Sequence, residues 1–206
     1  MMVPETLRAD LALIATLIDQ GVRLLDVGCG DGQLLEYLEK AKGVDGRGIE
    51  LSQSGVNASV KRGLAVVQGD ADVDLADYPD DAFDVVVLSQ TIQATRNPKE
   101  VLRELLRIGE RIVVSFPNFG HWKIRLQLGL RGRMPVTRSL ARQWYETDNI
   151  HLCTIKDFVA LCAELGATVE AAYSLSSRGK ATRIHHNAIR ANLLGEDAIF
   201  LIRRDS

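Results

Sequence analysis

The sequence LLDVGCGDGQLL, residues 24–35, places three glycines within five positions between two apolar runs. Three glycines this close weaken a strand or a helix, because each costs up to about 1 kcal/mol relative to alanine. The apolar run that ends at Val27 has the length of a buried strand, and a helical pattern begins at Gln33. The stretch is therefore predicted to be a turn that leads from a strand into a helix.

Strand and helix patterns alternate along the rest of the chain. Apolar residues at helical spacing from Leu7 to Ile18 predict a helix before the turn. Strands are expected at residues 22–27, 46–50, 64–68, 83–89, 111–116, 169–174 and 198–203, and helices at 33–40, 52–62, from 98 onwards and between 154 and 166. Asn97 and Thr154 are the expected N-caps of the last two helices. This alternation predicts an α/β protein with a mostly parallel, seven-stranded sheet, helices on both faces and ligands at the carboxyl ends of the strands.

Composition and length set the class of protein. The 206 residues are 46% apolar, and we expect them to form a single domain over residues 1–206. There is no apolar run of about 18 residues, and acidic residues interrupt the first apolar segment, so neither a membrane span nor a secretory signal is expected. A cytoplasmic location is predicted. Cys29, Cys153 and Cys162 have no metal-ligand spacing, which predicts reduced thiols and no metal site.

Charge is unevenly distributed although the net charge is only −2. Residues 64–95 contain acids and no Lys or Arg, whereas residues 121–145 contain six Lys and Arg residues and no acid. Such runs are commonly solvated faces, and they also occur at docking surfaces and beside anionic ligands. The near-neutral total makes nucleic acid an unlikely partner, although the basic run keeps that class open.

The spacing of the glycines limits the class of ligand that the turn is expected to bind. A dinucleotide-binding turn would have a third glycine at position 33, which is Gln33, and no lysine follows in the manner of a P-loop. The pattern D-x-G-x-G-x-G, formed by Asp26, Gly28, Gly30 and Gly32, resembles the first motif of class I S-adenosylmethionine (SAM) methyltransferases. The resemblance implies a Rossmann-like fold that binds SAM or S-adenosylhomocysteine. It also implies that the glycine backbone lies against the methionyl group and the ribose, with Asp26 near the ammonium group.

Two acids follow the next predicted strands. Glu50 ends GRGIE, where a carboxylate can accept from both ribose hydroxyls in charge-assisted bonds of about 1.5–3 kcal/mol. Asp70 follows VVQG and would face the edge of the adenine. The alternative is that each acid merely caps a helix or a turn. The remaining expected ligand contacts come from the backbone or side chains of Cys29, Leu51, Ser89 and Gln90.

The sequence does not identify catalytic residues. Methyl transfer needs mainly an aligned nucleophile, with a base only where that nucleophile must lose a proton. The segment SQTIQATRNP offers Gln90 and Gln93 as polar groups near the sulfonium, and no N-P-P-Y motif is present. Gln90, His121 and His151 are the candidates for catalysis, and the two histidines could equally be capping or packing residues.

Longer stretches carry a more specific resemblance. VVLSQTIQATRNP (86–98), VVSFPNFGHWKIRLQLGLRGRMPVT (113–137) and WYETDNIHLCTIKDF (144–158) resemble the methionine-biosynthesis protein W (MetW) family. The likeness covers nearly the whole chain and is lowest at residues 175–191, which are rich in Arg, Lys and His. Members of this family usually act beside a homoserine O-acyltransferase. The resemblance does not specify a methyl acceptor.

Two functions remain open at this stage. In the first, the protein is a SAM-binding partner or regulator of the acyltransferase; in the second, it is an active methyltransferase on a small molecule. Residues 120–150 are expected to form a helical cover over the ligand end of the sheet, despite an alternation in Trp122–Leu130 that alone would suggest a strand. The mixture of apolar, aromatic and basic residues in this cover is typical of protein interfaces and predicts that the cover contacts the acyltransferase.

Overall fold

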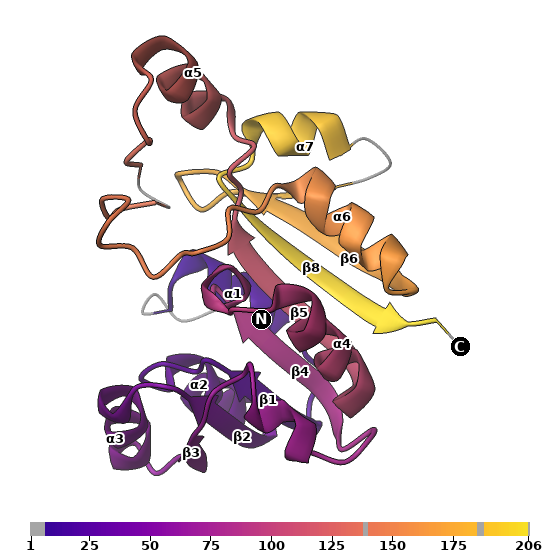
Figure 1. Cartoon of the computed structure of the whole chain (residues 1–206). Coiled ribbons are helices and arrows are strands. Elements are labelled where there is room, and N and C mark those ends of the chain that lie inside the picture. Colours follow the sequence, from indigo (N-terminus) through magenta and orange to yellow (C-terminus); the bar gives the residue numbers. More distant parts are fainter. Residues whose placement is uncertain (1–6, 138–139, 185–187, 206) are drawn as a thin grey trace.

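One mixed sheet forms the centre of the computed structural model, which describes residues 7–137, 140–184 and 188–205 (Figure 1). The described strands lie in the order β3-β2-β1-β4-β5-β8-β6-β7. Their bounds are β1 (Arg23–Val27), β2 (Asp45–Glu50), β3 (Val66–Gln68), β4 (Phe83–Ser89), β5 (Gly109–Pro117), β6 (Ala167–Leu175), β7 (Ala181–Arg183) and β8 (Asp197–Arg204). The first five are parallel, and β8, β6 and β7 pair antiparallel at one side.

The order of the strands indicates the edge of the sheet at which a ligand would bind. β1 pairs with β2 on one side and with β4 on the other, so the direction in which strands are added reverses at β1. Ligands of such sheets bind in the crevice at this point, beyond the carboxyl ends of the strands. The glycine turn that follows β1 lies at this edge, as the sequence predicted.

Helices cover both faces of the sheet. Their bounds are α1 (Ala9–Thr16), α2 (Gln33–Lys42), α3 (Gln53–Lys61), α4 (Pro98–Ile108), α5 (Trp122–Arg131), α6 (Ile155–Glu164) and α7 (Ala188–Leu194), with short 3₁₀ turns η1 (Asp74–Asp77) and η2 (Ile92–Ala94). Apolar residues of α1, α2 and α3 share one buried cluster with the sheet, and those of α4 and α6 share another. In the second cluster the rings of Phe116, Phe158 and Phe200 pack with centroids 4.8–5.9 Å apart.

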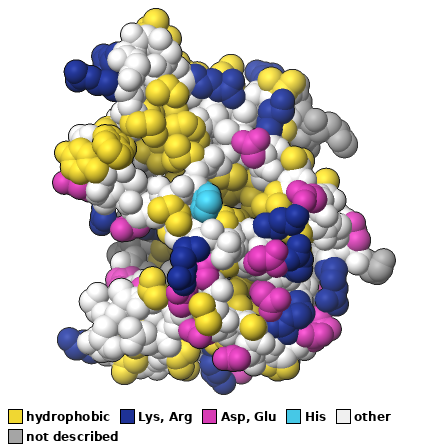
Figure 2. All heavy atoms as spheres, in the orientation of Figure 1, with side chains coloured by type: hydrophobic (Ala, Val, Ile, Leu, Met, Phe, Trp, Pro, Cys, Tyr) yellow, Lys and Arg dark blue, Asp and Glu magenta, His cyan; other side chains and the backbone are white. Residues whose placement is uncertain are grey.

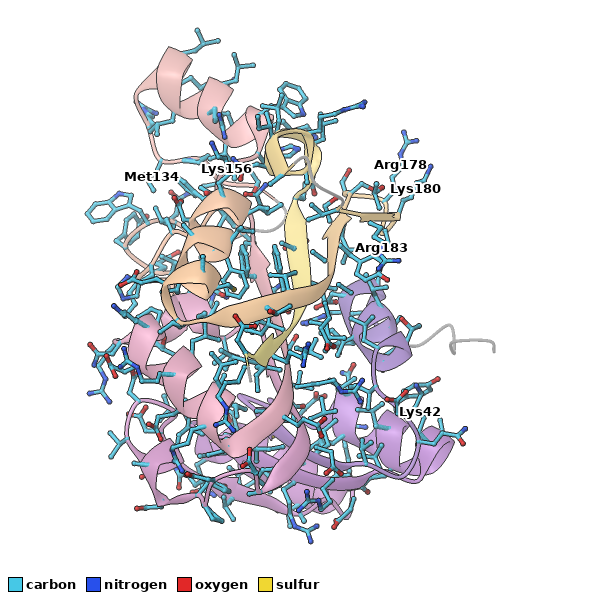
Figure 3. The ribbon with its side chains drawn as sticks, turned by 90° about the vertical axis from the view of Figure 1, so that its right-hand side faces the viewer. Lys42, Met134, Lys156, Arg178, Lys180 and Arg183 are labelled. Atoms are coloured by element: carbon cyan, nitrogen blue, oxygen red, sulfur yellow. The ribbon has the colours of Figure 1, made fainter. Side chains whose placement is uncertain are left out.

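The expected number of strands was wrong by one. β7 is an additional edge strand, in which residues 181–183 pair with residues 173–175 of β6. All three of its residues are exposed, so neither burial nor alternation marks it in the sequence. The sequence analysis also does not predict the short helix α7, because this helix likewise has no regular pattern of buried residues. Figure 3 shows Arg178, Lys180 and Arg183 around this hairpin, on the opposite side of the molecule from Met134.

Both expected N-caps, Asn97 and Thr154, occupy the N-cap position, and one of them makes the capping bond. The Thr154 hydroxyl accepts a hydrogen bond from the amide of Asp157 at 3.2 Å, as a cap should. The Asn97 side chain makes no such bond, although Pro98 does occupy the start of α4. Instead, the Asn97 amide donates to the carboxylate of Asp72 at 2.8 Å. A distant acid therefore fixes the start of α4 in place of the local side chain.

The segment after β5 begins with a helix rather than a strand. α5 projects from the rest of the molecule (Figure 1), and Ile124 is its one buried residue. The apolar residues that alternate in the sequence, Leu126 and Leu130 among them, are therefore exposed on a helix. Within the described part of the chain, no helix is both long and apolar enough to cross a bilayer. The three cysteines are free.

Candidate functional site

The glycine turn is fastened to the neighbouring strand and is left-handed at all three glycines. Gly28, Gly30 and Gly32 have φ angles of +73°, +60° and +78°, and the amide of Gly28 donates to the carbonyl of Ile49 at 2.8 Å. A Cβ on Gly28 would lie 2.4 Å from Thr91 Oγ1, and one on Gly32 would lie 2.3 Å from a methyl of Leu64.

Gly30 differs from the other two glycines of the turn. A Cβ there would meet no described heavy atom within 4 Å. Contacts inside the protein therefore require a glycine at positions 28 and 32. The sequence analysis attributes the need for these glycines to contact with the ligand instead. Gly30 is the glycine whose surface is open to a ligand.

Glu50 holds the turn closed. One carboxylate oxygen accepts from the amide of Gly30 at 2.9 Å. The other accepts from the amide of Ser52 at 2.9 Å and from its hydroxyl at 2.7 Å. Glu50 thus joins the turn, the end of β2 and the start of α3, which agrees with the alternative that this acid caps a turn and a helix. The oxygen that binds the Gly30 amide can accept one further bond, so the side chain can still receive one ribose hydroxyl.

Asp26 is a buried acid with an unused acceptor. Its residue is 2% exposed, and Oδ1 has no hydrogen-bond partner among the described residues. Burial, followed by the charge of Glu50, raises the pKa of Asp26 to about 7. A buried acceptor without a donor is costly and calls for an explanation, and a cationic ligand group is one.

Asp70 and Leu51 lie beyond the ends of β3 and β2. One oxygen of Asp70 accepts from the amide of Asp72 at 2.9 Å, and the other is ion-paired with Arg96. Leu51 is 66% exposed, and this apolar side chain is available to pack on a flat base. Cys29 packs against the core of the sheet, and burial raises the pKa of its thiol to about 12. Its side chain is therefore an unreactive thiol.

Ser89 is the last residue of β4, and Gln90, which follows it, lines a cavity. Ser89 Oγ lies 3.1 Å from Ser115 Oγ, and Gln90 has a φ angle of +52°, which is unusual for a residue with a Cβ. The amide of Gln90 donates to the Ser115 carbonyl at 2.9 Å, which holds this conformation.

The cavity beside Gln90 has a volume of about 320 Å³ and is rich in carboxylates. Its charged lining residues are Arg8, Asp10, Glu196 and Asp197. Arg8 is ion-paired with Asp10 at 2.8 Å, and the Gln90 side chain is hydrogen-bonded to Asp197. Burial, together with the neighbouring acids, raises the pKa of Asp197 to about 6. No local pattern in the sequence indicates this set of charged residues, because they come from the two ends of the chain.

The two candidate histidines lie in different surroundings. His121 is buried at the start of α5 and lines a second cavity, of about 210 Å³, with Lys123 and Glu196. Burial lowers its pKa. His151 Nε2 lies 3.2 Å from the carbonyl oxygen of Arg96, to which its N–H donates. Glu196 lines both this cavity and the cavity beside Gln90, so the two cavities share the Glu196 side chain. A catalytic role for either histidine stays a prediction.

The fold and the turn together define a class of protein. A parallel sheet with an antiparallel β8 beside β5, a glycine turn after β1 and an acid at the end of β2 make up the class I SAM-dependent methyltransferase fold. The family model described as "Methionine biosynthesis protein MetW" matches residues 8–202, and the chain belongs to that family.

A curated relative from Rhodopirellula baltica, the "Bifunctional methionine biosynthesis protein MetXA/MetW", is 33% identical over 174 residues. The match covers 80% of this chain and 28% of that protein. "Ajmaline N-methyltransferase" of Rauvolfia serpentina is 27% identical over 157 residues, which cover 71% of this chain and 52% of the relative. The chain thus spans about half or less of the length of these relatives.

Solved structures agree on the fold. A SAM-dependent methyltransferase from Mesorhizobium loti superposes with a TM-score of 0.70 at 15% identity, covering 96% of this chain and 98% of that one. Magnesium protoporphyrin IX methyltransferase from Synechocystis, solved with bound S-adenosylhomocysteine, gives a TM-score of 0.64 at 17% identity and covers 96% and 82%. At these identities the likeness concerns the fold alone.

Proposed function

We propose that this protein binds SAM or S-adenosylhomocysteine at the glycine turn and acts as a ligand-responsive partner of a homoserine O-acyltransferase. The observation that carries the binding site is the buried Oδ1 of Asp26, which has no hydrogen-bond partner among the described residues and lies near the end of the strand that leads to the open backbone of Gly30. A buried carboxylate of this kind suits the ammonium group of a methionyl moiety, and a glycine with open space beside it suits close approach of a ligand.

Each neighbouring residue suits one part of the nucleoside. Glu50 has one acceptor site left for a ribose hydroxyl, and Leu51 offers an apolar surface for the base. Asp70 would accept from the adenine amino group. When bound, SAM supplies a sulfonium-activated methyl group, whereas this chain's own residues bind and orient the nucleoside.

An exposed apolar surface supports the proposal of a protein partner. Figure 2 shows hydrophobic side chains gathered at its upper left, a region to which the segment following α5 contributes. Met134, Val136, Trp144 and Tyr145 of this segment are all more than two fifths exposed. Among the described residues, no carboxylate pairs with Arg131 or Arg133. Exposed aromatic and apolar side chains beside arginines are typical of interfaces.

The relatives support the identity of that partner. The Rhodopirellula baltica protein is named as a bifunctional MetXA/MetW chain, so a MetW part is joined there to a second function. We take the MetXA part to be the acyltransferase. Proteins that occur fused in one relative are candidates to associate as separate chains in another, and the segment 122–145 is the surface we assign to that contact.

Catalysis on a small molecule is the second candidate. The cavity beside Gln90 has room for a small acceptor, and three carboxylates line it, which favours a cationic or amine acceptor over an anionic one. Production of S-adenosylhomocysteine with a defined acceptor would support this activity. Its absence with the candidate acceptors, together with retained SAM binding, would support the partner function.

A capture experiment tests the partner surface. Arg125 Nε donates to the Gly120 carbonyl at 2.6 Å, so Arg125 is left intact. The test variant is Arg131→Glu/Arg133→Glu, and the control with the same charge change is Lys61→Glu/Arg178→Glu. Immobilised acyltransferase should capture wild type and control equally and the test variant at least tenfold less, with a SAM-dependent amount for wild type. Equal capture of all three would place the contact elsewhere.

A further inference from the structure

Arg96 is held from three directions in the loop between η2 and α4. Its guanidinium is ion-paired with Asp70, and its Nε lies 3.5 Å from Asp72 Oδ2. Its amide donates to the same Asp72 oxygen at 2.8 Å. Its carbonyl accepts from the ring of His151 at 3.2 Å. One residue thus connects the acid that follows β3 with the segment that follows α5.

The ion pair places the Arg96 guanidinium on one oxygen of the carboxylate that a base would need. One oxygen of Asp70 takes the amide of Asp72, and the other takes the Arg96 guanidinium. The Arg96 side chain is 62% exposed, and its guanidinium pairs with these two acids only among the described residues. Exposed ion pairs are worth about 0–1 kcal/mol, so a ligand can displace this one at small cost.

The same turn holds residues 150–151, which follow the segment 122–145 that we assign to the partner contact. The amides of Ile150 and His151 both donate to the carbonyl of Gln93 at 2.9 Å. Gln93 is 5% exposed, and its side-chain Nε2 donates to the Gln90 carbonyl at 2.7 Å. Residues 90–96 therefore form one wall between the ligand end of the sheet and residues 150–151.

We propose that Arg96 is a positioning residue that competes with the ligand's base for Asp70 and transmits occupancy of that carboxylate to residues 150–151. This inference rests on the proposed function, because it requires the nucleoside at Asp70. When the adenine amino group donates to Asp70, the guanidinium is released and residue 96 loses one of its three restraints. Its carbonyl contact with His151 then loosens, and the segment after α5 moves with it.

Calorimetry and fluorescence test the proposal together. The chain has two tryptophans, Trp122 at the start of α5 and Trp144 between α5 and α6, so intrinsic fluorescence reports on the part of the chain between β5 and α6. Arg96→Met removes the guanidinium and keeps the backbone contacts. We expect this variant to bind S-adenosylhomocysteine about two- to fivefold more tightly than wild type, as loss of a competing ion pair of about 0.4–1 kcal/mol requires. Its ligand-induced fluorescence change should fall to less than half.

Arg103→Met is the matched control, because Arg103 is an exposed arginine ion-paired with Glu100 on α4. It should leave affinity and fluorescence as in wild type. Unchanged or weaker binding by Arg96→Met, or a wild-type fluorescence change in that variant, would overturn the inference while leaving the ligand site intact. Failure of wild type to bind would instead remove the proposed function, and this inference with it.

Discussion

Replacing Asp26 by asparagine should stabilise the unliganded protein at neutral and alkaline pH. The pKa of Asp26 rises from its ordinary value of 3.8 to about 7 in the folded chain. The folded state therefore binds this proton more tightly than the unfolded state, and the stability it confers below pH 4 is lost as the pH rises through 7. Three pKa units correspond to about 4 kcal/mol, which sets the upper size of the effect.

Urea unfolding of wild type and Asp26→Asn between pH 5 and pH 8, without ligand, measures this directly. The free-energy difference should grow in favour of the variant as the pH rises and level off above pH 7. Arg23 and Asp84 form an exposed ion pair at the opposite end of β1, and Asp84→Asn serves as the control, with a reduced free energy of unfolding across this range. A variant less stable than wild type at pH 8, or a difference that does not change with pH, would refute the reasoning.

The same substitution should act on the ligand in the opposite direction. If the ionised Asp26 carboxylate attracts the ammonium group, Asp26→Asn will weaken binding of S-adenosylhomocysteine by at least tenfold at pH 8, while raising stability. An acid that lowers the stability of the folded protein and is nevertheless present is typical of a binding site. A variant that is more stable and binds equally well would separate Asp26 from the ligand.

Three further substitutions follow from the contacts described above. Glu50→Gln replaces one carboxylate oxygen, which accepts from the Gly30 or Ser52 amide, by an NH₂ group that can only donate. The free energy of unfolding measured in urea should therefore fall by about 1–3 kcal/mol. Asn118→Ala should cost about 2–4 kcal/mol in the same assay, because this buried side chain donates to two carbonyls at 2.8–2.9 Å and accepts from two amides at 3.0–3.3 Å. Gly28→Ala should lower the melting temperature more than Gly21→Ala, since both residues have left-handed φ angles and only Gly28 would bring a Cβ against Thr91. Equal decreases in melting temperature for the two variants would mean that the Thr91 side chain can move aside without a loss of stability.

The sequence predicted where the candidate site residues lie when their position depends on the local chain. Asp26 and Glu50 lie in the last two residues of strands that are easy to recognise, Gly30 lies in the turn after the first of them, and parallel strands bring their carboxyl ends to one edge. It did not predict that Glu50 would bind the Gly30 amide, because that bond depends on the close approach of two strands. The helix α5 was expected only from the likeness to methyltransferases, since its exposed apolar residues carry no helical pattern.

Contacts between distant parts of the chain were beyond sequence reasoning. Asp10 and Asp197 approach one cavity from the first helix and the last strand, and nothing in either stretch indicates the other. Asp70 was expected to be free for adenine, whereas Arg96, 26 residues later, pairs with it. The edge strand β7 went unnoticed because three exposed residues bury no face. Such features arise from packing and carry no local signature.

The most direct test of the ligand site is calorimetric titration of S-adenosylhomocysteine into wild type and Gly30→Val. A Cβ branch on Gly30 would fill the open space beside the turn, so the variant should show no binding at concentrations that saturate wild type at one ligand per chain. Gly63→Val is the control, because Gly63 also has a left-handed φ angle and open surroundings, and it lies outside the turn. It should bind normally, and Glu50→Ala should bind about 10- to 100-fold more weakly. Equal affinity in wild type and Gly30→Val would contradict the account.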